Sequence, residues 1–419
     1  MLAFAAGSSS IPRVTSVGHP VRWVVLVALL LAAVLWNLPR PALPRSPLAA
    51  AAVLVGIAAL STAWSVSPRT TFEHAVSLGI LFAACLLLAA AVSARPDRAS
   101  ALLAGILGGV AVVGILGLVV LVVDHGRAVA AATYEGPARF RGFGQDPNTV
   151  ALLFGITAPV GVWAVLARRR TVLAAVTLCL LVGTIVATGS RGGIVAGAVG
   201  SAVVVRVRAG PRPRSILAGL AAVAAVAAAG AAIQSLPKPA TSGVPVVVPA
   251  NLPAARAGYL DAESAYPLNA DVGRPLPGGG QPAVTRSLFG GSGRLDAWRG
   301  ALHAVARRPV AGHGFGTEQA VFVDRYYQFV GGLPENSYIG LALQLGVAGL
   351  AALAALVAVL ALAGVRALRG PRRDIAAACL GVLAAGLVVA LAQSYLYSVG
   401  NIAAAALWIP AFMLGTADG

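Results

Sequence analysis

The sequence predicts an all-α polytopic membrane protein with about 11–12 transmembrane helices and one large extracytoplasmic loop region that carries short amphipathic helices. Three observations lead to this fold class. The chain has 419 residues, of which 58% are hydrophobic and only 11% are charged, which excludes an ordinary soluble globular protein. Apolar runs near the length of a bilayer span recur along the chain. Arginines gather in every second connection between these runs.

Eleven apolar runs are candidate spans. They lie at 22–38, 48–63, 75–93, 101–123, 148–167, 171–187, 193–205, 215–234, 337–365, 375–394 and 400–415. The seventh is short, and the last is the least certain to cross the membrane. The three cysteines fall inside apolar runs, so they predict neither a disulfide framework nor a zinc site.

The arginine distribution predicts the topology. Five connections hold fifteen arginines and two acidic residues, Asp97 and Asp374: residues 40–45, 95–98, 168–170, 206–214 and 366–373 with the adjoining Asp374. The positive-inside rule places them in the cytoplasm. The net charge of +17 is therefore mostly topological, and it indicates no nucleic-acid partner. The alternate connections then face outward.

The N-terminus poses a conflict. Eleven spans with this alternation place the N-terminus outside, whereas Arg13 and Arg22 favour the cytoplasm. Two explanations remain open: a twelfth short span exists, or the segment 21–38 does not cross the membrane simply.

We expect three regions. Residues 1–235 form an N-terminal bundle of about eight spans, 236–336 an extracytoplasmic region, and 337–419 a C-terminal bundle of about three spans. Residues 236–292 are rich in Pro and Gly, which predicts irregular structure. Residues 293–330 predict short helices. In the first of them an apolar stripe recurs at helical spacing: Leu295, Trp298, Leu302 and Val305.

Two outward stretches carry arginines beside glycines or at a helix start. In RFRGFGQDPNTVALLF, Asp146 followed by Pro147 predicts the capped start of a span. Arg139 and Arg141 are not needed for this cap and are candidates to contact phosphate. In TGSRGG, Arg191 either extends to interfacial lipid or meets a ligand, and its neighbouring glycines allow close approach.

Two further stretches hold the remaining candidates. In GRLDAWR, Arg294 and Arg299 either face solvent or bind substrate. The GHGFGT stretch is interpreted as a tight turn between helices that contains His313. In PENSY, Glu335 and Asn336 precede the ninth span, where a carboxylate and a cap are favourable without any catalytic role.

Together, these stretches resemble the O-antigen ligase and polysaccharide polymerase family of bacterial membrane glycosyltransferases. The resemblance runs from about residue 64 (WSVSPRTTF) to 350, in the order RFRGFGQDPNTVALL, TGSRGG, GRLDAWRGALHAVARRPVAGHGFGT and ENSYIGLALQLGVAGL. It implies a GT-C-like fold, twelve spans and a cytoplasmic N-terminus. It also implies that Arg191 and Arg294 engage a donor diphosphate.

The family commonly has His-Asn where this chain has Glu335-Asn336. The resemblance makes this position the base that activates the acceptor hydroxyl, and a glutamate with a raised pKa can do the same work. His313 stays open as a second candidate, although it does not match the family position. The departure leaves ligase and polymerase as open alternatives.

The residue types suit glycosyl transfer from a polyprenyl (undecaprenyl) diphosphate donor to a glycan or glycolipid acceptor. Such a donor already lies in the membrane, and preorganised arginines stabilise the charge that gathers on the departing diphosphate. We expect Arg191, Arg294 and Glu335 to be catalytic and the reaction to be inverting, without metal or other cofactor. The expected substrate-binding residues are Arg139, Arg141, Asn336, Arg299 and His313.

The expected location is the bacterial plasma membrane, with the site on the extracytoplasmic side of a monomer embedded in the lipid bilayer. The alternative is a transporter or flippase of a lipid-linked glycan. A transporter should carry ionisable residues along an intramembrane path. Here the polar residues gather at one outer face instead, which favours surface chemistry.

Overall fold

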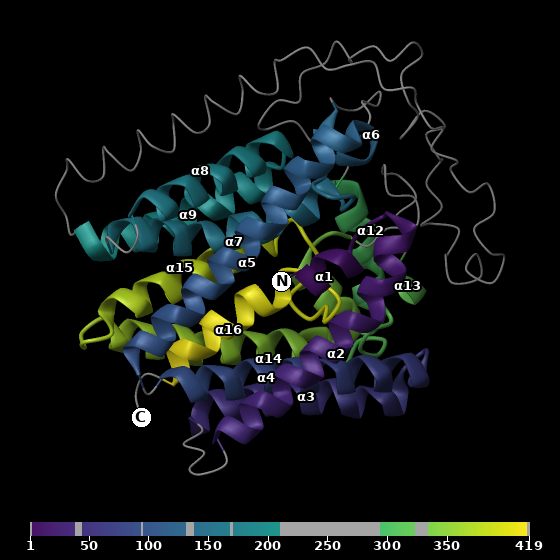
Figure 1. The fold of residues 1–419 in the computed structure, drawn as a ribbon. Coiled ribbons are helices and arrows are strands. Elements are labelled where there is room, and N and C mark those ends of the chain that lie inside the picture. The colour runs from purple at the N-terminus through teal and green to yellow at the C-terminus, as the bar shows by residue number, and fades with distance from the viewer. Residues whose placement is uncertain are drawn as a thin grey trace.

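A computed structural model describes residues 2–37, 44–93, 95–130, 138–167, 171–209, 294–322 and 334–416. These residues form a bundle of long helices (Figure 1). The helices of the first part are α1 (Leu2–Gly7), α2 (Pro12–Asn37), α3 (Arg45–Leu60), the 3-10 helix η1 (Ser61–Trp64), α4 (Pro68–Ser93), α5 (Pro96–Val123), α6 (His125–Ala128), α7 (Pro147–Leu166), α8 (Thr171–Ala187) and α9 (Arg191–Ala209). Those of the second part are α12 (Arg294–Arg307), α13 (Glu318–Val321), α14 (Ser337–Ala367), α15 (Arg373–Val389) and α16 (Ala404–Gly415).

The predicted all-α polytopic class is confirmed. Within the described residues the strands are β1 (Val129–Ala130) and β2 (Arg139–Phe140), one short antiparallel pair. Six helical stretches are long and apolar enough to cross a membrane: Pro12–Leu35, Arg45–Trp64, Pro68–Val92, Pro96–Val123, Pro147–Leu166 and Ser337–Ala367. A helix lies over each other predicted span as well, except 215–234, which is outside the described residues.

Small residues set the helix crossings at the centre of the bundle. A Cβ atom added at Gly155 of α7 would lie 2.7 Å from the carbonyl oxygen of Gly193 in α9. Gly200 of α9 and Gly381 of α15 make a similar close approach. Lipid tails are as apolar as leucine, so close backbone packing of this kind is a main force between membrane helices. These crossings bring the N-terminal end of α9 beside α7 and α15.

Helix α14 is broken at Gly346, whose φ of 62° lies in the left-handed region. The loop from Pro309 to Gly314 fills the break. The backbone N–H groups of His313 and Gly314 donate to the carbonyls of Leu343 (3.0 Å) and Gln344 (2.9 Å). On the other side of the break, the N–H of Val347 donates to the Pro309 carbonyl (2.8 Å).

The GHGFG stretch is therefore more than the predicted tight turn between helices. It supplies hydrogen bonds to carbonyls that lose their helical partners at the break, as buried backbone requires. The part of α14 from Gly346 to Ala367 is about 33 Å long and is enough by itself to span a bilayer.

Helix α16 lies in the middle of the bundle, in yellow in Figure 1, and all of its residues are buried. The preceding segment, 391–403, is partly buried inside the bundle. The Tyr395 hydroxyl donates to the Gly386 carbonyl (2.7 Å), and the Trp408 indole N–H donates to the Leu396 carbonyl (2.8 Å). The predicted span 400–415 thus becomes a shorter helix that starts after a buried loop.

The N-terminal segment lies at the end of the bundle that holds residues 139–146. The N–H of Ser10 donates to the Gly144 carbonyl (2.7 Å), and the Gln145 side chain donates to the Ala5 carbonyl (3.0 Å). If that end faces outward, this placement agrees with the eleven-span count and disagrees with a cytoplasmic N-terminus. Arg22, which favoured the cytoplasm, reaches instead toward the Gly400 carbonyl inside the bundle (3.4 Å).

Candidate functional site

One end of the bundle holds residues 139–146 and the start of α9, and we call this end the rim. Arg139 joins two of the predicted stretches there. Its Nε donates to the carbonyl of Thr188 (2.6 Å), and its Nη2 donates to Oδ1 of Asn148 (2.6 Å). The first bond reaches the TGSRGG turn, and the second reaches the first turn of α7. Arg139 therefore positions the turn that carries Arg191, while its contact with phosphate stays a prediction.

The other two charged residues of this stretch, Asp146 and Arg141, also have hydrogen-bond partners. Asp146 caps α7 as predicted, because its side chain accepts from the backbone N–H groups of Asn148 (2.8 Å) and Thr149 (3.4 Å). Arg141 donates to the Gln145 carbonyl (3.1 Å) and to the Ser10 hydroxyl (2.9 Å). It thus holds the N-terminal segment against the rim, a partner that its sequence position does not reveal.

Arg191 begins α9 at the rim, directly after a turn in which Gly189 has a φ of 62°. The two glycines that follow let the helix end sit between its neighbours. A Cβ at Gly193 would lie 2.7 Å from Cβ of Ala151 in α7, and one at Gly192 would lie 3.2 Å from Cβ of Ala392, just after α15. The backbone that follows the half-buried Arg191 is thus packed between α7 and the segment after α15.

Glu335 lies two residues before the start of α14, and its backbone has a φ of 49°. Among the described residues it alone, apart from glycines, has a positive φ. A non-glycine residue in this region costs about 1–3 kcal/mol, and such strain gathers at functional sites. Asn336 next to it is the N-cap of α14, since its side chain accepts from the N–H groups of Tyr338 (3.0 Å) and Ile339 (3.1 Å).

The start of α14 is attached to the segment that follows α15. The Ser337 N–H donates to the Ala390 carbonyl (2.8 Å), and the Ser337 hydroxyl donates to the Gln393 carbonyl (2.6 Å). The side-chain N–H of Gln393 donates to Oε2 of Glu335 (3.4 Å). A Cβ at Gly192 would contact Ala392. Gly192, next to Arg191, and the carboxylate of Glu335 therefore both lie close to the same two-residue segment, Ala392–Gln393.

Sequence reasoning missed Glu318, a buried carboxyl group close to this segment. Its Oε1 accepts from the Ser394 hydroxyl (3.1 Å), and its Oε2 accepts from the Tyr397 hydroxyl (3.0 Å) and the Gln344 amide (3.2 Å). Burial raises the pKa of Glu318 to about 7, although the bonds from Tyr397 and Ser394 oppose this rise. Its partners lie 26 to 79 residues away in sequence, so no local sequence pattern predicts this cluster.

His313 lies in the loop that fills the break in α14. Its side chain is buried, and its Nδ1–H donates to the Leu343 carbonyl (3.0 Å). Burial lowers the pKa of His313. One ring nitrogen is thereby committed to holding the loop, and a role as base or in substrate binding stays a prediction.

The predicted helix is present as α12, but one residue of its predicted apolar stripe is not buried. Ala301 and Ala304 pack against Phe322 and Leu343, whereas Leu302 is 50% exposed. The small alanines allow the close approach, so Leu302 at the neighbouring helix position points away. Arg299 is exposed.

The GRLDAWR and PENSY stretches are also joined. The indole N–H of Trp298 donates to the carbonyl of Pro334, the residue before Glu335 (2.8 Å). Arg294 is the first residue of α12, one helical turn before Trp298, and its side chain lies outside the described residues. Its predicted contact with diphosphate is therefore untested.

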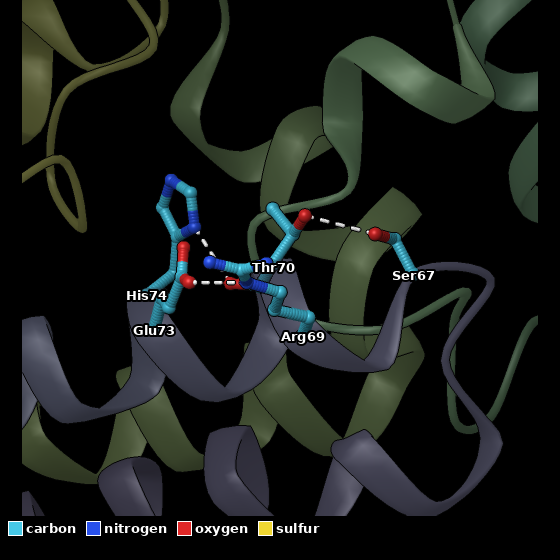
Figure 2. A network of polar contacts seen from close by, with 5 residues as sticks. All are labelled: Ser67, Arg69, Thr70, Glu73 and His74. Carbon is cyan, nitrogen blue, oxygen red and sulfur yellow. Dashed lines mark hydrogen bonds and ion pairs between the residues drawn. The ribbon is translucent and has the colours of Figure 1, made fainter.

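The first turn of α4 carries a separate polar network, shown in Figure 2. Arg69 pairs with Glu73 (2.9 Å), the Ser67 hydroxyl donates to Thr70 (2.8 Å), and His74 contacts the Thr70 carbonyl (2.8 Å). The ion pair is exposed and adds little stability. The network organises the start of α4, beside which the N–H of Val66 donates to the His313 carbonyl (3.0 Å).

A family model matches part of the chain. Residues 175–354 match the family model described as O-Antigen ligase. No curated protein matches the chain. The matched segment runs from α8 into α14, and it includes the TGSRGG, GRLDAWR and ENSY stretches with Arg191, Arg294 and Glu335. This match supports the assignment of the chain to the O-antigen ligase family.

Proposed function

We propose that this membrane enzyme transfers a glycan from a polyprenyl diphosphate carrier to an acceptor hydroxyl on the outer face of the bacterial plasma membrane. The family match supports an O-antigen ligase-like membrane enzyme in general. The observation that carries the finer proposal is that Gly192, next to Arg191, lies close to Ala392, while Glu335 accepts from the neighbouring Gln393. A cation and a carboxylate at one rim are the two groups that such a transfer needs.

The rim suits a diphosphate. Helices α9 and α14 begin there, and the dipole at a helix N-terminus favours anions. Arg191 adds a fixed positive charge, and Arg294 is the proposed second arginine. As the bond between the anomeric carbon and the diphosphate oxygen breaks, its electron pair leaves with the diphosphate, and these donors stabilise the added charge.

Glu335 is the proposed base. The acceptor oxygen attacks the anomeric carbon from the face opposite the diphosphate, and its proton passes to the Glu335 carboxylate, so the configuration inverts. Oε2 accepts from Gln393, and this bond orients the carboxylate that is proposed to take the proton. Diphosphate leaves without needing a proton, so the step requires no general acid.

Glu318 is proposed to position this base. It binds Ser394 and Tyr397 on one side and Gln344 of α14 on the other. It therefore fixes the segment that presents Gln393 to Glu335. Glu318 is 5% exposed, which favours this indirect role over direct contact with a sugar.

The experiment that tests the function uses purified protein in liposomes with a labelled polyprenyl-diphosphate oligosaccharide, followed by size analysis of the products. A ladder of products would indicate a polymerase, and one discrete larger product would indicate a ligase. Unreacted donor that has crossed the bilayer would instead indicate transport and would overturn the proposal.

A further inference from the structure

The N-terminal segment, residues 2–11, packs against residues 139–146, which we call the rim loop. Ser9 is buried, and its hydroxyl donates to the Phe143 carbonyl (2.8 Å). A Cβ at Gly144 would lie 2.8 Å from Oγ of Ser9, so the two segments are in direct contact. Packing as close as this leaves the rim loop little freedom to move by itself.

Hydrogen bonds join the two segments in both directions. The Ser10 N–H donates to the Gly144 carbonyl (2.7 Å), and the Gln145 side chain donates to the Ala5 carbonyl (3.0 Å). Arg141 donates from Nη2 to the Ser10 hydroxyl (2.9 Å) and from Nε to the Gln145 carbonyl (3.1 Å). Arg141 therefore uses two of its nitrogens to hold the N-terminal segment and the rim loop together.

The rim loop also holds the turn that carries Arg191. Arg139 donates from Nε to the Thr188 carbonyl (2.6 Å), and Thr188 lies three residues before Arg191. Arg139 and Arg141 are separated by one residue, and their side chains bind different segments. A displacement of the rim loop would therefore be passed on to the Arg191 turn.

We infer that the N-terminal segment positions Arg191 for the proposed transfer, and that Arg141 is a positioning residue that acts through its bond to Ser10. The inference rests on the proposed function. It gives Arg141 this indirect role in place of the predicted contact with phosphate. The role matters because a donor stabilises a developing charge best when it is held in place before the charge forms.

The test is a double-mutant cycle with Ser10→Ala and Arg141→Gln, made singly and together in the full-length protein in liposomes. Initial rates over a range of concentrations of the labelled polyprenyl-diphosphate oligosaccharide give kcat and KM. We expect Ser10→Ala to lower kcat by about two- to tenfold, the range that corresponds to one hydrogen bond, with KM unchanged. In the Arg141→Gln background, Ser10→Ala should have no further effect, because the bond is already absent.

Two further variants show whether the Ser10 hydroxyl is responsible. Ser10→Thr keeps a hydroxyl at an exposed position and should retain the wild-type kcat. Ser16→Ala removes an exposed hydroxyl of α2 whose bond to the Arg13 carbonyl is local, and it should leave kcat unchanged. A higher KM in Arg141→Gln, or losses that multiply in the double variant, would mean that Arg141 binds the donor directly and would overturn the inference.

Hydrogen exchange provides a second measurement that needs no transferase activity. Exchange in Ser10→Ala should be faster than in wild type in the rim loop and at residues 188–191, and unchanged in α3. Unchanged exchange at residues 188–191 would also overturn the inference, since the rim loop would then not control the Arg191 turn. If the wild-type protein transferred no glycan, the proposed function would fail, while hydrogen exchange would still decide whether the N-terminal segment holds this turn.

Discussion

Gln393 donates its side-chain N–H to Oε2 of Glu335, and the next residue, Ser394, donates its hydroxyl to Oε1 of Glu318. One dipeptide after α15 thus contacts both carboxyl groups. Glu335 stands just before the start of α14, and Glu318 is buried beside the first part of this helix, at Gln344. The proposed base and its buried support therefore depend on one loop.

Replacement of Glu335 by Gln should abolish most of the transfer. The amide keeps the size of the side chain but cannot take the acceptor proton, and loss of a general base typically lowers the rate by about 10²–10⁴-fold. The measurement is the initial rate with the labelled lipid-linked donor. Glu73→Gln is the matched control, because Glu73 is an exposed carboxylate on α4 whose ion pair is local. Wild-type turnover in Glu335→Gln would remove Glu335 from the mechanism.

Arg191→Ala should lower the rate of transfer by about 10²–10³-fold, as expected for the loss of one donor that stabilises a developing anion. Arg191→Lys should recover part of the rate, since an ammonium keeps the charge but loses the planar fork. Arg69→Ala, which removes an exposed guanidinium from α4, is the control. A comparable loss in this control would mean that the effect reflects general charge, and not a site at Arg191.

Much of the fold could be predicted from the sequence because apolar runs and arginine placement are local signals. The cap at Asp146 was equally local. The break at Gly346 and the cluster around Glu318 were not predictable in this way, since they depend on contacts between distant segments. Even Arg139, singled out as a phosphate contact, binds Thr188 across 49 residues, a bond that no spacing rule reveals.

Glu318 should make stability depend on pH. Its pKa is raised from 4.5 to about 7 in the folded chain, mainly by burial, so folding favours the protonated form. The contribution of Glu318 to the free energy of unfolding is therefore complete below about pH 4.5. It is lost as the pH rises toward 7, by an amount on the order of 3 kcal/mol. Thermal unfolding between pH 5 and 8 should show this decline in wild type.

Glu318→Gln provides the comparison for that experiment. The amide has no proton to lose, so the variant should lose much less stability over the same pH range. It can still accept from Tyr397 or Ser394 through its carbonyl oxygen. Parallel declines in the two proteins would assign the pH dependence to another group.

Gly346→Ala should destabilise the protein and detach the loop from α14. Alanine in the left-handed region costs about 1–2 kcal/mol, and the added Cβ would also collide with the backbone of Val310. The bonds that replace the broken helix, from His313 and Gly314 to α14, must then shift. Gly105→Ala in α5 is the control, because a Cβ there meets no atom within 4 Å. We expect a lower unfolding midpoint and faster hydrogen exchange at residues 309–317 in Gly346→Ala alone. Equal unfolding midpoints for the two variants would mean that the break in α14 is not needed to hold the loop from Pro309 to Gly314 in place.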